Sequence, residues 1–443
     1  MKKKLLGLMM AMTMVASLAA CGGSSNGAAA ETTDAAAETT EEAAEATEEA
    51  SEEPVAEGVD VTAIKVGQIC VEDENSGYDA AHIEGLATAM KNLGMDPATQ
   101  LTLVVDIPED ETCYDTAVDE AEGGCGIIFS DSYGHQTYMQ QAASEYSDVT
   151  FVACTGDMAA PSGLANLKNI FPHTYESRYV SGVVAGMKLK EMMDDGKVTD
   201  PYVGYVGAYP YAEVVSGYTA FFLGVRSVVP EAHMDVQFTN SWYDPTAEGA
   251  AAEALISKGC CIISQHADST GAPSAVQAAH ENGKEVYCVG YNIDMRAVAP
   301  DVALTSAQNN WSVLYEHMLK CYIDGTEIPT DFSAGINEDA VMISELGDAC
   351  AEGTAEAVEA AWAGIKDGSI QVFDTANFTV QPTDNGSYAV DEAGHLTSAF
   401  ALDSDGDWVN DNGEAIIDGA FVESQLRSAP YFSLDIDGIT KLN

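Results

Sequence analysis

Five acidic side chains near the C-terminus have the spacing of a calcium-binding loop. They occupy positions 1, 3, 5, 9 and 12 of an EF-hand-type pattern: Asp403, Asp405, Asp407, Asp411 and Glu414. Such a loop needs glycine at position 6 for its sharp turn, but Trp408 stands there, and no helical pattern flanks the segment. We therefore interpret it as a solvated acidic hairpin, and we expect neither a metal site nor a cofactor.

Common catalytic motifs are absent from the sequence. There is no Gly-x-Ser-x-Gly elbow, P-loop, His-Glu-x-x-His or dinucleotide-binding glycine motif after the first predicted strand. Gly123–Gly126 precedes a strand rather than a helix, so it is interpreted as a turn. Glu72-Asp73-Glu74 is interpreted as a solvated loop. The sequence thus predicts a protein that is not an enzyme, with a secreted nucleosidase-like hydrolase as the remaining enzymatic alternative.

The charge of the chain restricts its partners. It has 443 residues, with 18 Lys+Arg against 71 Asp+Glu and a formal net charge of −53. Nucleic acids and anionic membrane surfaces are bound by clustered Lys and Arg, so no nucleic acid is expected as a partner. Hydrophobic residues make up 46% of the chain, which is enough to form a sizeable core.

The N-terminal segment has the features of an export signal. Lys2–Lys4 precede an apolar run, Leu5–Leu18, that is short for a membrane span, and small residues then lead to Cys21, as in the lipobox of bacterial lipoproteins. We predict that residues 1–20 are a lipoprotein signal peptide and that Cys21 is lipidated. Residues 21–60 are acidic and lack bulky apolar side chains, which predicts a disordered tether. The expected location is the extracytoplasmic face of the cell membrane, with the protein lipid-anchored.

Nine further cysteines make an odd number for an exported chain, so at least one is expected to be unpaired. Several lie in apolar, strand-like runs such as Ile69–Val71, where cysteine behaves as a small hydrophobic residue. Their disulfide pairing stays open at this point.

From Ile64 onward, short apolar runs alternate with amphipathic stretches of helical length. Runs of this kind are typical of parallel strands buried on both faces. The predicted strands are 64–71, 101–105, 126–129, 150–154, 202–206, 234–238, 261–264, 286–289 and 302–305. The predicted helices between and after them are 80–93, 175–193, 213–228, 246–258, 274–282 and 311–323. The fold class is therefore α/β, with two Rossmann-like lobes.

After Gly335 the pattern changes. A helix is predicted over 353–366, followed by short strand-like pieces separated by Gly, Asn and Asp: 370–373, 378–380, 400–402, 416–417 and 431–434. This part is predicted to form an antiparallel C-terminal appendage.

Several sequence strings, in order over about residues 61–330, resemble the basic membrane protein (BMP) family of solute-binding lipoproteins of ABC importers, including its PnrA-like purine and purine-nucleoside receptors. The strings are Lys65–Gly67, Asn75–Asp79, Tyr175–Gly186, Val203–Ala208, Thr239–Pro245, Ile263–Ser269, Val289–Met295 and Leu304–Ser306. The resemblance implies a type I periplasmic-binding-protein fold with three crossovers, near Gly156–Ser162, Tyr291–Arg296 and Thr326–Gly335. Residues 61–158 and 295–330 would form lobe 1, and residues 159–294 and 331–443 would form lobe 2.

The resemblance also implies a ligand site in the cleft between the lobes. Tyr78 and Trp242 align with two aromatic side chains that stack on a flat ring, and Asp79 aligns with a neighbouring polar contact. Asp157 aligns with an Asp that forms hydrogen bonds with the edge of a purine ring. Ser132, Tyr133 and His135 from lobe 1, and His266 and Asp268 from lobe 2, are further candidates that follow predicted strands.

One departure from the family pattern bears on the ligand. Asn292 stands where the nucleoside receptors have an Asp that holds ribose, and their assisting Lys is absent near Gln308. The resemblance then favours a purine base such as adenine, with a purine nucleoside as the alternative and a polyhydroxylated ligand such as a sugar still open. The expected partner is an ABC permease and the expected state a monomer; the alternative role is a ligand-sensing lipoprotein.

Overall fold

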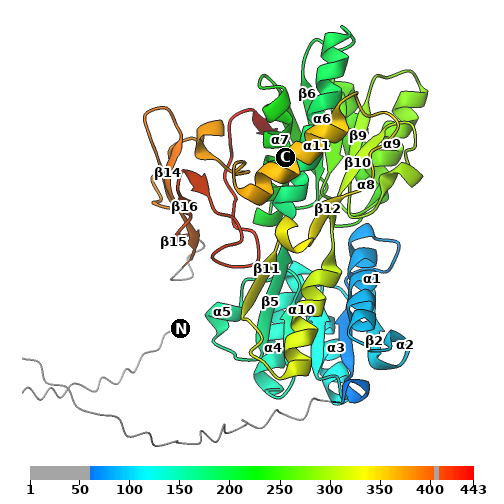
Figure 1. The fold of residues 1–443 in the computed structure, drawn as a ribbon, viewed down its shortest axis with the longest axis vertical. Coiled ribbons are helices and arrows are strands. Elements are labelled where there is room, and N and C mark those ends of the chain that lie inside the picture. The colour runs from blue at the N-terminus through cyan, green and yellow to red at the C-terminus, as the bar shows by residue number, and fades with distance from the viewer. Residues whose placement is uncertain (1–59, 404–408) are drawn as a thin grey trace, which may run out of the picture. The chain divides into compact units, whose positions relative to one another are not determined.

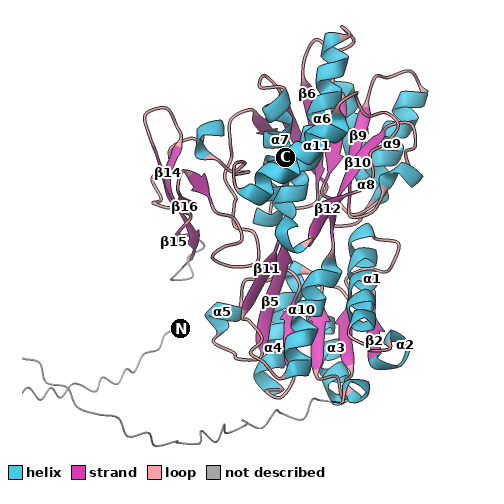
Figure 2. Cartoon of the chain, viewed as in Figure 1, coloured by secondary structure: helices cyan, strands magenta, loops and turns pink. Residues whose placement is uncertain are grey.

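The described residues form two large sheets with helices on both faces of each, and two small sheets in the C-terminal part (Figures 1 and 2). This computed structural model describes residues 60–403 and 409–443. Within those ranges no helix is both long and apolar enough to cross a membrane. The predicted signal peptide, Cys21 and the rest of the tether up to residue 59 lie outside the described residues.

The first sheet is entirely parallel and has the order β11-β5-β4-β3-β1-β2. Its strands are β1 (Val66–Ile69), β2 (Leu101–Val104), β3 (Ile127–Ser130), β4 (Thr150–Ala153), β5 (Leu167–Pro172) and β11 (Asp331–Ala334). Helices α1 (Gly77–Asn92) and α10 (Trp311–Asp324) cover one face, and α3 (Glu111–Glu122) and α4 (Gln136–Glu145) the other. The short helices α2 (Pro97–Gln100) and α5 (Ala159–Ser162) lie in its connections.

The second sheet has the order β12-β10-β9-β8-β6-β7-β18, and only its edge strand β12 is antiparallel. Its strands are β6 (Tyr202–Gly207), β7 (His233–Phe238), β8 (Ile262–Gln265), β9 (Tyr287–Tyr291), β10 (Ala303–Asn309), β12 (Val341–Ile343) and β18 (Ile439–Lys441). Its helices are α6 (Thr174–Asp194), α7 (Ala212–Val228), α8 (Pro245–Lys258) and α9 (Gly271–Glu281).

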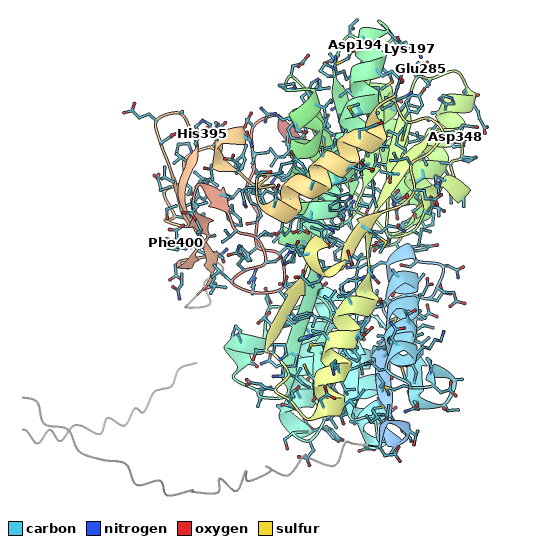
Figure 3. The ribbon with its side chains drawn as sticks, viewed as in Figure 1. Asp194, Lys197, Glu285, Asp348, His395 and Phe400 are labelled. Atoms are coloured by element: carbon cyan, nitrogen blue, oxygen red, sulfur yellow. The ribbon has the colours of Figure 1, made fainter. Side chains whose placement is uncertain are left out.

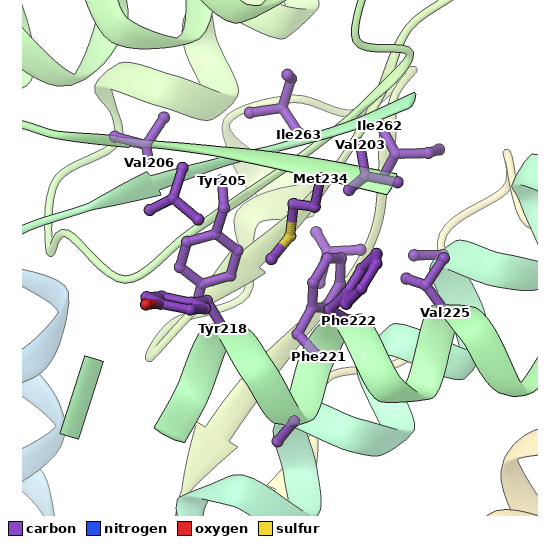
Figure 4. Close-up of a cluster of buried hydrophobic side chains, with 14 of the residues drawn as sticks. Val203, Tyr205, Val206, Tyr218, Phe221, Phe222, Val225, Met234, Ile262 and Ile263 are labelled. Atoms are coloured by element: carbon purple, nitrogen blue, oxygen red, sulfur yellow. The ribbon is translucent and has the colours of Figure 1, made fainter. Parts of the chain in front are cut away.

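The core of the second sheet depends on helix α7 and on two glycines. Figure 4 shows α7 side chains such as Phe221 and Phe222 packed with Val203 and Met234 of the strands. A Cβ atom at Gly182 of α6 would overlap the Phe221 carbonyl, and one at Gly224 of α7 would overlap the Tyr179 carbonyl. The two glycines therefore allow α6 and α7 to pack with their backbones in close approach.

The crossings between the sheets come later in the chain than expected. Strands β5 and β11 belong to the first sheet and β10 to the second, so the expected lobe boundaries at 158/159, 294/295 and 330/331 all differ from the sheet assignment. The chain leaves the first sheet after Pro172, returns with α10, and leaves it again after β11. The polar residues Lys168 and Asn169 interrupt the apolar pattern of the buried strand β5, and its neighbour β11 is remote in sequence.

The C-terminal part has the predicted helix, α11 (Thr354–Asp367), and the predicted antiparallel appendage. Its strands are β13 (Tyr388–Val390), β14 (Leu396–Leu402), β15 (Asn412–Glu414), β16 (Ile416–Ile417) and β17 (Ala420–Phe421). The segments 370–373, 378–380 and 431–434 are not strands, which corrects the prediction; Val380 forms only an isolated bridge with Ile436. Their apolar side chains are instead packed in the core of the second sheet.

The acidic loop considered as a calcium site connects β14 and β15. Asp405 and Asp407 lie outside the described residues. The Glu414 carboxylate accepts hydrogen bonds from the backbone N–H groups of Ala399 and Ile416 and from the Ser398 hydroxyl. These bonds tie Glu414 into the predicted hairpin, near the labelled Phe400 (Figure 3).

The nine described cysteines are free, and seven of them are buried. Their burial agrees with the interpretation that they act as small hydrophobic residues. The surface carries acids such as Asp194 and Asp348, with exposed ion pairs such as Lys197–Glu285 (Nζ–Oε1 3.5 Å) (Figure 3). Exposed pairs of this kind add little to stability.

Candidate functional site

A cavity of about 110 Å³ is lined by residues that follow the carboxyl ends of strands in both sheets. A single water molecule needs about 10–15 Å³ on this measure, so the cavity can hold a larger ligand. This end of a doubly wound sheet is where ligands bind. The cavity is lined by Val71, Tyr78, Asp131, Ser132, Tyr133, Thr155, Asp157, Tyr211, Ala212, Glu213, Trp242, His266, Asp268, Tyr291, Arg427, Ala429 and Pro430.

Tyr78 is fixed at the first-sheet side of the cavity. It lies in the first turn of α1, which is capped by Ser76. Its hydroxyl donates to the backbone carbonyls of Asp131 at 2.9 Å and Cys154 at 3.2 Å. Its ring packs edge-on against the buried Trp311, with centroids 6.1 Å apart. Because both ends of the side chain are held, the ring presents a preorganised apolar surface to the cavity.

The second-sheet side carries an aromatic cluster. Trp242 lies 5.2 Å from Tyr209 and 5.9 Å from Tyr211, measured between ring centroids. Tyr211 in turn lies 5.7 Å from Tyr133 of the first-sheet side. Aromatic rings from both sides therefore meet at the cavity, which favours a ligand with flat or apolar faces.

Asp157 follows β4 and holds the main ion pair of the cavity wall. Its Oδ2 atom lies 3.1 Å from Nη1 of Arg427 and accepts a hydrogen bond of 3.1 Å from the Tyr133 hydroxyl. Its backbone N–H donates to the Gln136 side chain at 2.8 Å. The loop is thus fixed, and a carboxylate is held at the cavity with one oxygen already engaged.

His266 and Glu213 form a second polar contact at the cavity. His266 Nε2 lies 2.5 Å from Glu213 Oε1, and His266 Nδ1 lies 3.2 Å from the Tyr205 hydroxyl. Burial, then the positive charge of Arg178, lower the pKa of His266 to about 4. The neutral ring therefore donates from Nε2 to Glu213 and accepts at Nδ1 from Tyr205. A Cβ atom on Gly217 of α7 would overlap this imidazole, so the glycine makes room for it.

A buried acid pair lies behind the Tyr78 side. Ligand atoms of Cys70, Asp79 and Asp131 lie within 4.8 Å of one another. Burial, then the charge of Asp79, raise the pKa of Asp131 well above its usual range. The neutral form of Asp131, which this raised pKa favours, reduces the repulsion between the two carboxyl groups. Asp268 also has a raised pKa, because it is buried and lies near the acids Asp79 and Glu248.

Seven residues of the predicted site line the cavity: Tyr78, Ser132, Tyr133, Asp157, Trp242, His266 and Asp268. The other three lie behind them. Asp79 accepts from the Ser76 hydroxyl and the Glu72 backbone, and His135 Nε2 donates to the Ile107 carbonyl at 2.9 Å. Asn292 donates from Nδ2 to Asp268 Oδ1 at 2.9 Å. These three side chains position the wall of the cavity rather than form it.

The sequence interpretation missed several lining residues. Tyr211 and Glu213 follow β6, so the rule that cleft residues follow strands was sufficient to find them. Tyr291 ends β9, and its ring packs under the Arg178 guanidinium, with Cζ 3.6 Å from the ring centroid. Arg427, Ala429 and Pro430 come from the C-terminal part and had no local signal.

Comparison with known families identifies the chain. Residues 69–376 match the family described as Bmp, ABC transporter substrate-binding protein PnrA-like. The chain belongs to the Bmp family. Bmp proteins are extracytoplasmic solute-binding components of ABC transporters rather than enzymes, and they bind small molecules for delivery to a permease. The predicted family and the two-lobed α/β fold are confirmed.

Individual relatives of this Bmp-family chain differ in the ligand that their names give. A purine-binding protein from Brucella abortus is 30% identical over 311 residues, covering 70% of this chain and 83% of its own length. A Haloferax volcanii relative, whose name proposes glucose binding in an ABC transporter, is 34% identical over 227 residues, covering 51% of this chain and 54% of its own.

Solved structures share the fold. Solute-binding proteins of ABC transporters from Aeropyrum pernix and Conexibacter woesei superpose with TM-scores of 0.58 and 0.56, at 16% and 20% identity. The first match covers 73% of this chain and 95% of that protein, and the second covers 70% and 98%.

Proposed function

We propose that this Bmp-family protein captures a purine base, such as adenine, in the cavity between its two sheets. The observation that carries the proposal is the lining itself: aromatic rings from both sides, with the Asp157 carboxylate at the wall. A purine base has two π-faces and an edge of N–H groups and ring nitrogens. Stacking on aromatic side chains contributes about 1–3 kcal/mol per base in other proteins.

The charge of the lining argues against a phosphorylated ligand. The Asp157 and Glu213 carboxylates line the cavity together with the buried acids Asp131 and Asp268, whose raised pKa values favour their neutral forms, whereas Arg427 is the one Lys or Arg among its described lining residues. A phosphate group would meet several carboxyl groups and a single guanidinium that is already paired with Asp157. A neutral ligand that donates hydrogen bonds suits the site better.

The base is favoured over the nucleoside by the bonds of two side chains. Asn292 donates to Asp268, and Gln308 Nε2 donates to the Asn292 backbone carbonyl at 3.0 Å. Both amides therefore have partners within the protein, and neither lines the cavity. In the related nucleoside receptors, charged groups near these positions hold the ribose, so this chain is expected to hold ribose poorly.

The same proposal includes the membrane attachment and the partner. We infer that Cys21 carries a lipid, that residues 21–60 tether the folded part to the membrane, and that the monomer delivers its ligand to an ABC permease. The lipobox-like sequence before Cys21 and the family membership support this.

Isothermal titration of the purified chain tests the ligand. We expect adenine, guanine or hypoxanthine to bind more tightly than adenosine, and glucose and ribose to bind weakly or not at all. Tighter binding of adenosine than of every base would contradict the base assignment. Tight binding of glucose without any purine would place the ligand with that named for the Haloferax relative.

A further inference from the structure

The C-terminal part of the chain forms part of the binding site, although it lies outside the family match. The match to the Bmp family ends at residue 376. Three residues beyond that point, Arg427, Ala429 and Pro430, nevertheless line the cavity. They belong to one loop, Ser424–Pro430, which we call the strap. The strap is therefore an addition to the two-lobed site.

Both ends of the strap are anchored to the second-sheet lobe. Glu423 Oε2 accepts from the backbone N–H groups of Tyr431 at 3.3 Å and Phe432 at 3.0 Å, so the two ends are bonded to each other. Phe432 is fully buried, and its ring stacks on Phe373 with centroids 4.5 Å apart. Farther along, β18 pairs with β7 of the second sheet.

The tip of the strap bonds to the first-sheet lobe at two places. Ser428 donates from its backbone N–H at 3.0 Å and from its hydroxyl at 2.9 Å to Oδ1 of Asp331, the first residue of β11. Arg427 pairs with Asp157, which follows β4. The strap is thus rooted in one lobe and bonded to the other, across a wall of the cavity.

The Arg427 guanidinium is held in one orientation. Its Nε donates to the Ala429 carbonyl at 3.3 Å and its Nη2 to the Pro430 carbonyl at 3.5 Å, both within the strap. Its Nη1 faces Asp157. A guanidinium has five N–H donors in a fixed fork, so N–H groups remain for a ligand acceptor beside the Asp157 carboxylate. The pair presents a donor next to an acceptor, which complements the edge of a purine base.

We propose that the strap is a latch of the ligand site, which holds the two lobes together over the bound molecule through Ser428–Asp331 and Arg427–Asp157. Separation of the lobes has to break these bonds, because the strap moves with the second lobe while Asp331 and Asp157 move with the first. The latch therefore controls how long the ligand stays bound. The latch proposal rests on the proposed function only because it places the ligand in this cavity.

Asp331→Ala and Ser428→Ala test the latch without touching the ligand, because neither residue lines the cavity. Dissociation of adenine from the full chain is measured by stopped-flow tryptophan fluorescence. We expect the dissociation rate to rise about tenfold for Asp331→Ala, which removes two hydrogen bonds to a carboxylate, and about threefold for Ser428→Ala, which removes one. The double variant should match Asp331→Ala, since both changes break the same contact.

Ser398→Ala is the matched control. Its hydroxyl also bonds to a carboxylate, that of Glu414, but it lies on β14 of the appendage and away from the cavity lining. Its dissociation rate should equal that of the wild type. Rates within about twofold of wild type for both Asp331→Ala and Ser428→Ala would overturn the latch.

The outcome for the latch is separable from that for the purine. If the wild type binds glucose and no purine, the purine assignment fails, and the same dissociation rates measured with glucose decide the latch. A wild type that binds neither class of ligand overturns both proposals.

Discussion

His266 Nε2 lies 2.5 Å from Oε1 of Glu213 at the wall of the cavity. The contact joins the loop after β8 to the first turn of α7. It fixes the imidazole tautomer and directs the Glu213 carboxylate, and it is buried on the histidine side. Its pH dependence follows from the pKa of the imidazole.

Protonation of His266 should lower the free energy of unfolding as the pH falls. Its pKa is about 4 in the folded chain, against about 6.5 in an unfolded one, because burial and Arg178 disfavour the charged ring. The folded state prefers the neutral form, so this contribution is present above pH ~6.5 and is lost as the pH falls through ~4. Urea unfolding of wild type and His266→Gln should be measured between pH 7 and 4. The free energy of unfolding should fall less with decreasing pH for the variant than for the wild type. Parallel curves would contradict the neutral imidazole.

Ionisation of Glu120 should lower the free energy of unfolding as the pH rises. It is 3% exposed, and burial raises its pKa to about 8. The folded state prefers the protonated acid, so the contribution is present below the unfolded value of ~4.3 and is lost as the pH rises through ~8. Relative to Glu120→Gln, the wild type should lose about 1.4 kcal/mol of unfolding free energy per pH unit across this window. Asp119→Asn, exposed on the same helix, is the control and should not show this slope.

Trp242→Ala should weaken purine binding by about one to two orders of magnitude, since one stacking face contributes about 1–3 kcal/mol. Titration calorimetry of both proteins with adenine measures the change. Trp362→Ala on α11 removes another half-buried indole outside the cavity lining and should leave affinity unchanged. Equal affinity of Trp242→Ala and wild type would remove the stacking model.

Asp157→Asn should weaken binding by about tenfold for a base that donates two hydrogens to this edge, and by less for one that donates one. The amide keeps one acceptor and replaces the other with a donor, and it also loses the charge that pairs with Arg427. Calorimetry with guanine, adenine and hypoxanthine compares the bases. The exposed Asp148→Asn serves as control. A uniform loss for all three bases would show that Asp157 does not read the edge.

Cys21→Ser should release the protein from the membrane or leave its precursor unprocessed, because the thiol is the proposed site of lipid attachment. Cell fractionation with immunoblotting follows location and size. Cys321→Ser, in the folded part, should stay membrane-bound. A Cys21→Ser protein that is membrane-bound and mature in size would contradict lipidation.

The sequence by itself determined the order and type of most elements. Each apolar run from 64–71 to 302–305 overlaps a strand, because most of these strands are buried on both faces and need continuous apolar residues, with the edge strand β2 as the exception. Asp244-Pro245 begins α8 as an N-cap and a first-turn proline, which is equally local information. The sequence also predicted three cavity residues correctly, because residues that follow parallel strands meet at one edge of the sheet. These are Tyr78, Asp157 and Trp242.

Only the tertiary structure decided that β5 and β11 belong to the first sheet and that the C-terminal part contributes to the cavity wall. In β5 the polar residues Lys168 and Asn169 interrupt the apolar pattern, and the strand is defined by its hydrogen bonds to β4 and β11. No sequence motif surrounds Arg427. Its place at the cavity is evident only from its ion pair with Asp157, which is remote in the chain. Local periodicity reports burial, whereas contacts between remote segments depend on how the core closes, and no local pattern encodes them.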